Sequence, residues 1–307
     1  LGKEIYGKRF VVRNKFGIGD LFIYSSLFLG IFLVIWPLMN LLAWALTPTK
    51  NVHLLSGLDI FPKGFDTSVF ELMLSNPNVL MSFLNSIYIT TVGLSLNIFF
   101  TAICAYALSK DYLPGRNIFL TLIIFTLVFE PSIVPEFLVV KRVGLLNSYW
   151  SIILYKMVNV YYLILMIRFF KELPNAYFEA AEIDGANHFQ TFYYIVIPLS
   201  IPAFMVIGLF YIVMHWNEYF HAMIYLNDTS KWPLQVLLRE FAIVGERSAL
   251  VPAQNIIDGE KWGDVYQIDL RRIRATIIFI ALFPILLLFP IILRYFTKGI
   301  NLGGIKE

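Results

Sequence analysis

The sequence predicts an all-α polytopic membrane protein, a single transmembrane domain of residues 1–307 with six membrane-spanning helices. Of the 307 residues, 58% are hydrophobic and 15% are charged, whereas about a quarter of the residues of a soluble protein are charged. The mean hydropathy is +0.71. Long charge-free runs recur along the chain, and they are uniformly apolar, whereas the strands of a membrane barrel alternate. We therefore expect helices, which satisfy their own backbone groups in hydrocarbon.

The first predicted span covers residues 21–46 and follows a basic tail that ends at Asp20. The span carries no charge and exceeds the roughly 20 residues needed to cross a bilayer. It lacks a convincing small-residue cleavage site, so we expect it to remain as a span and not to act as a cleavable signal peptide. A polar loop with several prolines and glycines follows and ends near Asn78.

Five further spans are predicted after this loop; prolines interrupt the third of the six and bend the fifth, and the sixth contains Pro284 and Pro290. The predicted ranges are 79–108, 118–140, 149–170, 195–220 and 275–293. A loop of about 50 residues, roughly 223–274, precedes the last span, and we expect it outside the cell, without a catalytic domain. Six spans place both termini on one side, and the Lys and Arg residues of the tail and the short loops favour the cytoplasm for that side.

Several kinds of chemistry have no support in the sequence. There is no G-x-x-x-x-G-K-[ST] phosphate loop, so we expect a non-enzymatic chain that does not itself hydrolyse ATP and that binds no cofactor. The four histidines, His53, His188, His215 and His221, lack cysteine or carboxylate neighbours at metal-ligand spacing, so we expect no metal site. A net charge of +3, spread over several loops, does not indicate a nucleic-acid partner.

The most specific pattern lies between the fourth and fifth spans. Residues 179–202 read E-A-A-E-I-D-G-A-N-H-F-Q-T-F-Y-Y-I-V-I-P-L-S-I-P. We expect Glu179 in the first turn of a short helix, where a carboxylate suits the helix dipole. Ala180 and Ala181 keep one face of that helix thin enough for close docking. Gly185 can adopt a positive backbone angle and turn the chain back toward the bilayer.

The spacing of this pattern resembles the cytoplasmic signature of ABC importer permeases. The matching positions are Glu179-Ala180-Ala181, Gly185, Ile195 and Pro198. Five further stretches resemble the carbohydrate-importing branch: N-S-I-Y from Asn85, A-Y-A-L-S-K followed by P-G-R, G-L-L-N-S-Y from Gly144, L-P at Leu173-Pro174 and D-G-A from Asp184. Within that branch, the chain looks more like permeases for oligosaccharides or polysaccharides, the alginate type included. The resemblance covers roughly residues 85–219.

This resemblance implies a type I importer permease fold in the bacterial cytoplasmic membrane. Its implied partners are a second homologous permease subunit, two ATP-binding cassette subunits that hold ATP and Mg, and an extracytoplasmic solute-binding protein that delivers an oligosaccharide. Segment 175–192 is implied to form a cytoplasmic coupling helix that docks on an ATPase. The residues implied to make this contact are Glu179, Ala180, Ala181, Asp184, Gly185 and His188.

Polar side chains at or near membrane depth are candidates for a translocation path or gate. They are Glu130 in the third span and Trp216, Asn217, Glu218 and Tyr219 at the outer end of the fifth. A membrane-embedded carboxylate such as Glu130 is costly unless it faces protein or a water-filled path, although it could also pair with a base such as Lys156. An interfacial aromatic belt would predict the second group equally well.

The substrate class stays open at this point. Arg271, Arg272 and Arg274 could favour an anionic sugar such as a uronate oligomer, or they could contact lipid headgroups or the solute-binding protein. A permease for a non-sugar substrate and an ion-coupled secondary transporter are the remaining alternatives. The second would place an ion site on broken helices near the membrane midplane, for which Glu130 and Pro131 are the only hint in the sequence.

Overall fold

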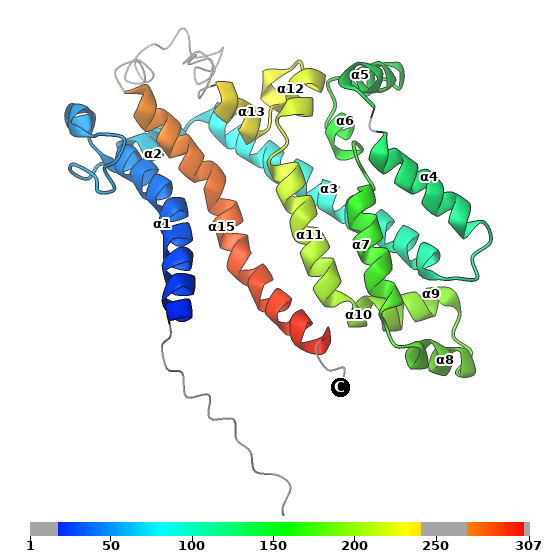
Figure 1. The fold of residues 1–307 in the computed structure, drawn as a ribbon. Helices are drawn as coiled ribbons and strands as arrows, with labels where there is room; N and C mark the ends of the chain where they lie inside the picture. Colours follow the sequence, from blue (N-terminus) through cyan, green and yellow to red (C-terminus); the bar gives the residue numbers. More distant parts are fainter. Residues whose placement is uncertain (1–17, 130, 241–268, 304–307) are drawn as a thin grey trace, which may run out of the picture. The chain divides into compact units, whose positions relative to one another are not determined.

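The computed structural model describes residues 18–129, 131–240 and 269–303, and the regular structure of these residues consists of helices and turns. The chain divides into two compact units at the boundary between Asp66 and Thr67. Figure 1 shows the labels of the elements in each unit.

The first unit contains a long helix and a loop folded onto its end. Helix α1 covers Ile18–Leu46 and a short 3-10 helix, η1, covers Thr49–Leu54. Most apolar side chains of α1 between Leu21 and Ile35 are exposed, as expected for a helix surrounded by lipid. Asn40 Nδ2 donates a hydrogen bond to the Asp59 carbonyl (2.6 Å), which fixes the loop against α1. The predicted first span is therefore confirmed as a continuous helix.

The second unit is built on helix α3, Pro77–Ser109, which packs against both α7 and α11. The sequence determines where α3 begins, because the Asn76 side chain accepts from the backbone N–H of Asn78 (2.9 Å) and Pro77 needs no donor in the first turn. The helix ends at Lys110, and the chain turns at Gly115, which has a φ of +72°. A short preceding helix, α2, covers Ser68–Leu74.

Two of the predicted spans are strongly bent. Helices α4 (Arg116–Val128) and α5 (Ile133–Arg142) make an angle of 116°, and the helical segment His188–Leu199 meets α11 (Ile201–Trp216) at 80°. Among the described residues, two helices are each long and apolar enough to cross a membrane, namely Gly19–Leu46 and Pro77–Ser109. The number rises to four when each bent pair is counted as one span.

The predicted span 149–170 is not one continuous helix. It consists of α6 (Trp150–Ile153) and α7 (Val160–Lys171), separated by a non-helical stretch. Asn159 ends this stretch and caps α7, since its side chain accepts from the backbone N–H of Tyr161 at 3.0 Å. The interruption therefore has a local signal in the sequence.

The remaining helices lie between α7 and the C-terminal end of the chain. They are α8 (Asn175–Ile183), α9 (His188–Thr191), the π-helix η2 (Phe192–Val196), α10 (Ile197–Leu199), α12 (Phe220–Tyr225), the 3-10 helix η3 (Thr229–Lys231), α13 (Leu234–Arg239) and α15 (Leu270–Gly303). The predicted loop 223–274 thus contains the second half of α12, all of η3 and α13, and the start of α15. Residues 241–268 of that loop lie outside the described part.

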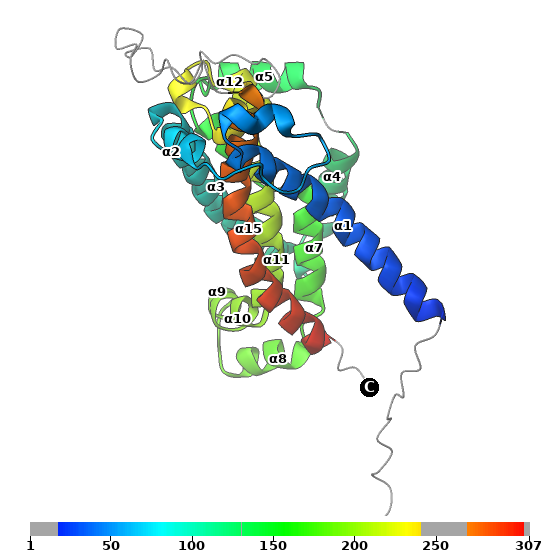
Figure 2. The ribbon, with the colours of Figure 1, turned by 90° about the vertical axis from the view of Figure 1, so that its left-hand side faces the viewer.

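Opposite ends of the second unit carry different helices, as the two views in Figures 1 and 2 show. Helices α8 and α9 lie at one end, and α5, α12 and α13 lie at the other. Near the second end, Leu234 of α13 packs with Ile273 and Ile277 of α15 in a buried cluster that also contains Trp216. Ala105, Leu108 and Phe170 belong to a separate buried cluster.

Candidate functional site

Helix α8 ends at the glycine that the sequence singled out. Gly185 has a φ of +75°, so the predicted positive angle is confirmed. The N–H of Gly185 donates to the Glu182 carbonyl (3.1 Å), and the N–H of Ala186 donates to the Ala181 carbonyl (2.9 Å). This pair of bonds is a Schellman ending, which satisfies the last carbonyls and fixes the direction in which the chain leaves the helix.

Two expectations about α8 were wrong. The helix begins at Asn175, so Glu179 is its fifth residue and does not lie in the first turn. Its carboxylate therefore gains little from the helix dipole, which acts within the first turn. Ala181 is only 5% exposed because it packs inward, so only Ala180 of the two alanines is available on the outer surface.

The outer surface of α8 and α9 combines charged and apolar side chains. The predicted contact residues Glu179, Ala180, Asp184, Gly185 and His188 are all exposed. Two apolar neighbours that the sequence analysis did not single out are exposed to an unusual degree, Ile183 at 87% and Phe189 at 75%. Large apolar side chains grouped with charges on a short, well-capped helix are typical of a protein-binding surface.

The turn after α3 supports α8 from the side. Lys110 Nζ lies 3.6 Å from the centre of the Phe178 ring and 5.0 Å from that of Tyr106. Such cation–π contacts contribute about 0.5–2 kcal/mol, depending on how well they are desolvated. Burial lowers the pKa of Lys110, and the nearby Glu182 carboxylate opposes that effect. The Tyr112 and His188 rings also stack, with centroids 6.0 Å apart.

The same turn is joined to the end of α7 by an ion pair. Asp111 Oδ1 lies 2.7 Å from Lys171 Nζ and 3.6 Å from Arg116 Nη1. The hydrogen bond and charge of Lys171 lower the pKa of Asp111. The Asp111 side chain is well exposed, so water and salt screen this network, and it adds little stability.

Helix α9 is fixed by a reciprocal cap. Asn187 Oδ1 accepts from the Gln190 N–H (2.9 Å), and Gln190 Oε1 accepts from the Asn187 N–H (2.9 Å). From α9 the chain runs through η2 and α10 before it bends into α11. A movement of α8 and α9 would therefore reach α11 through short helices, without a long loop in between.

At the opposite end of the unit, the predicted polar residues differ in their hydrogen bonds and in their exposure. Glu218 is held by His221, since its Oε1 accepts from the His221 N–H (2.9 Å) and lies 3.0 Å from His221 Nδ1. Asn217 is exposed, and its side chain bonds back to the Val213 carbonyl (2.9 Å). Tyr219 is 44% exposed.

Trp216 instead packs in the core and does not reach a surface. Its side chain is 4% exposed, its Nε1 donates to the Ala281 carbonyl (3.0 Å), and its ring makes an edge contact with Phe83. The position of Trp216 therefore indicates a role in packing α11 against α15 and α3. Glu130 lies outside the described residues. Among the described residues, no three His, Cys, Asp or Glu side chains are grouped closely enough to hold a metal ion.

Comparison with known proteins assigns this architecture to a family. Residues 88–302 match the family described as the binding-protein-dependent transport system inner membrane component. The chain belongs to this family. The matched range of the permease begins inside α3 and ends inside α15, so it contains α8, α9, Asn217, Glu218 and Tyr219 but not α1.

Two relatives of the permease come from Bacillus subtilis (strain 168). Protein LplC is 39% identical over 249 residues, which are 80% of the permease and 81% of LplC. The polygalacturonan/rhamnogalacturonan transport system permease protein YtcP is 35% identical over 287 residues, 94% of the permease and 98% of YtcP. A chain in the crystal structure of a bacterial ABC transporter involved in the import of the acidic polysaccharide alginate superposes with a TM-score of 0.80 and 27% identity. That superposition covers 92% of the permease and 99% of that chain.

Proposed function

We propose that the permease is a transmembrane subunit of an ATP-driven importer of oligosaccharides. Its similarity to YtcP and to a chain of an alginate importer supports a saccharide substrate. The observation that carries the ATP-driven part is the α8–α9 surface, where α8 exposes Ile183 and the capped α9 exposes Phe189 beside charged neighbours. In this proposal the surface docks on an ATP-hydrolysing subunit, and segment 175–192 passes the movement to α11.

The proposed assembly follows from this role. A second permease of similar fold lies beside this one in the bilayer, two ATP-binding cassette subunits hold ATP and Mg, and an extracytoplasmic solute-binding protein delivers the sugar. The permease contributes six spans when the interrupted α6–α7 stretch and α15 are added to the four apolar candidates. Both termini then lie in the cytoplasm with α8 and α9, and the region around 223–274 lies outside, where a solute-binding protein can reach it.

Coupling needs two arrangements of the docked helix that nucleotide favours unequally, because a ligand shifts an equilibrium only by binding one state better. The test is reconstitution of the permease with its partner permease and ATPases in proteoliposomes. We expect ATP hydrolysis to rise when solute-binding proteins loaded with oligosaccharides are added, and the sugar to accumulate inside. A Glu179→Lys variant should insert normally but lose ATP-driven uptake. Normal uptake by this variant would contradict the proposed coupling surface.

The match to an alginate importer and to YtcP favours acidic oligosaccharides as a second candidate substrate. A panel of neutral and uronate oligosaccharides in the same assay separates the two candidates. An ion-coupled transporter would instead accumulate its substrate without ATPase subunits, in response to an ion gradient. Uptake under that condition would overturn the ATP-driven proposal.

A further inference from the structure

Buried side chains stabilise the non-helical stretch that separates α6 from α7. Residues 154–159 leave the helix, and Lys156 adopts a φ of +51°. The freed carbonyls of Lys156 and Met157 accept from Asn97 Nδ2 of α3, at 3.2 and 2.9 Å. Non-helical backbone within a span is tolerated where protein buries it or where it lines a cavity. Asn97 therefore stabilises the non-helical backbone of this stretch.

A second layer holds Asn97 in place. His215 Nε2 of α11 lies 2.7 Å from Asn97 Oδ1, and because an amide oxygen can only accept, the histidine is the donor. Nearby, the N–H of Asn159 donates to the Tyr211 hydroxyl (3.0 Å), which also lies 2.7 Å from Thr101 Oγ1. Residues of α3 and α11 thus fix the middle and the C-terminal end of the non-helical stretch.

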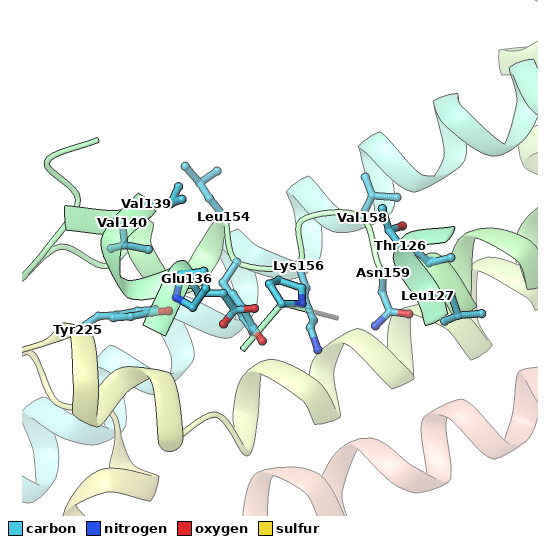
Figure 3. A pocket seen from close by; sticks show the side chains of 14 residues that line it. Thr126, Leu127, Glu136, Val139, Val140, Leu154, Lys156, Val158, Asn159 and Tyr225 are labelled. Carbon is cyan, nitrogen blue, oxygen red and sulfur yellow. The ribbon is translucent and has the colours of Figure 1, made fainter. Parts of the chain in front are cut away.

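The stretch forms one wall of a cavity of about 520 Å³ (Figure 3). This volume falls within the range of roughly 300–1,000 Å³ found for small-molecule sites. Much of the wall is apolar, including Val139, Val140, Leu154 and Val158. The polar groups in the wall come from α4, α5, the non-helical stretch and α12, and they are Thr126, Glu136, Tyr155, Lys156, Asn159 and Tyr225.

Two carboxylates near the cavity are held by contacts with His221. The Glu136 side chain is 19% exposed, and its Oε2 lies 3.7 Å from Nε2 of His221. His221 is also bonded to Glu218 and packs its ring 3.8 Å from that of Tyr155, measured between centroids. Two carboxylates therefore approach His221 from α5 and from the end of α11. Lys156 is the single lysine among the residues that line the cavity.

We propose that this cavity binds one uncharged sugar ring of the transported oligosaccharide, a step that depends on the function proposed above. A carboxylate can only accept hydrogen bonds and an ammonium can only donate them, so Glu136 and Lys156 together suit neighbouring hydroxyls, which do both. The apolar wall matches the C–H faces of the ring. An acyl chain would offer these polar side chains no hydrogen-bonding group, and a uronate would bring a further carboxylate close to that of Glu136.

A matched pair of probes tests the charge preference directly. One probe is tetragalacturonate, and the other is the same oligosaccharide after chemical reduction of its carboxylates to alcohols. Uptake is measured in proteoliposomes that contain the full complex and its solute-binding protein. The binding protein is the same in every assay, so its own preference cancels when each variant is compared with wild type.

We expect the wild-type complex to take up the reduced probe. Glu136→Gln should raise the KM for the reduced probe about tenfold, the usual effect of weakening one charge-assisted hydrogen bond. It should also shift the uptake ratio toward the uronate, because one repelling charge is gone. Lys156→Met should shift the ratio the opposite way. Lys141→Met is the control, since Lys141 is exposed on α5 but does not line the cavity.

Each result supports or contradicts either the cavity assignment or the proposed import function. An unchanged KM in both cavity variants would overturn the cavity assignment while leaving the importer function intact. A KM that rises equally for both probes would indicate a structural role for Glu136 and would also overturn it. An uptake ratio of the two probes that neither Glu136→Gln nor Lys156→Met changes would contradict the preference for an uncharged ring. Failure of the wild-type complex to take up any oligosaccharide would count against the proposed function itself.

Discussion

Gly93 and Gly208 lie on the two long helices that pack together in the second unit, but their surroundings differ. A Cβ atom at Gly93 would lie 2.5 Å from His215 Nε2, a separation that normal packing does not allow. A Cβ atom at Gly208 would meet Leu94 at 3.8 Å, which is ordinary contact. The glycine of α3 is therefore required by the His215–Asn97 bond, whereas the glycine of α11 is not.

We expect Gly93→Ala to destabilise the permease by about 1–3 kcal/mol, because the added methyl group must displace His215 or separate α3 from α11. Gly208→Ala is the matched control, and it should be neutral or slightly stabilising because alanine is the better helix former. The measurement is the midpoint of thermal unfolding of the full-length protein in its complex. Equal midpoints for the two variants would show that His215 moves aside without cost.

Gly185 supports a prediction of a different kind, since no atom lies within 4 Å of its Cβ position. Any cost of substitution therefore comes from the φ of +75°, and Gly185→Ala should cost about 1–2 kcal/mol locally. Gly185→Asn should cost less, because asparagine tolerates this conformation better. We expect Gly185→Ala to lower ATP-driven uptake more than ATP hydrolysis, with Gly185→Asn between it and wild type.

The control for this series is Gly57→Ala, at another glycine with free space around its Cβ position but without a positive φ. Uptake and hydrolysis should both remain at the wild-type level in this variant. A Gly185→Ala variant that behaves like Gly57→Ala would remove the conformational argument for the end of α8.

At the scale of elements, the prolines predicted the breaks in the third and fifth spans, but nothing in the sequence analysis predicted the interruption between α6 and α7. Asn159 before Val160 is a local capping signal that could have placed the start of α7. The break from Leu154 onward was not predictable in this way, because Asn97, about sixty residues earlier in the chain, holds the freed carbonyls. The coupling segment shows the same division: Gly185 was predictable from its own conformational freedom, whereas the support of α8 by Lys110 depends on tertiary packing.

The contact between Lys110 and Phe178 joins α3 to α8, and it can be measured with a double-mutant cycle. Lys110→Met and Phe178→Leu should each lower the stimulation of ATP hydrolysis by the loaded binding protein, because α8 loses its lateral support. The double variant should be less impaired than the sum of the two, with a coupling energy of about 0.5–2 kcal/mol in thermal stability. Lys171→Met is the control for removing a lysine, since its pair with Asp111 is exposed. Strict additivity would show that the Phe178 ring and the Lys110 ammonium act independently.

At the scale of the whole molecule, the composition predicted the environment and the family signature predicted the fold, but neither fixes the membrane orientation. The basic residues of the tail favour a cytoplasmic N-terminus, and positive charge on long loops is a poor guide to their location. The positions of the helices in the second unit bear on this orientation. Helices α8 and α5 lie at opposite ends of the second unit, so the two ends should face opposite sides of a membrane.

Cysteine labelling tests this orientation because the chain contains a single cysteine, Cys104. In a Cys104→Ser background, Ile183→Cys places a thiol on an 87% exposed position of α8, and Lys141→Cys places one on the exposed end of α5. A membrane-impermeant maleimide should label Lys141→Cys in intact cells and Ile183→Cys only in inverted vesicles. ATPase subunits, when bound, should protect Ile183→Cys in the vesicles and leave Lys141→Cys in intact cells unaffected. Labelling of Ile183→Cys from outside would place the α8–α9 surface away from any cytoplasmic ATPase, and the ATP-driven proposal would then fail.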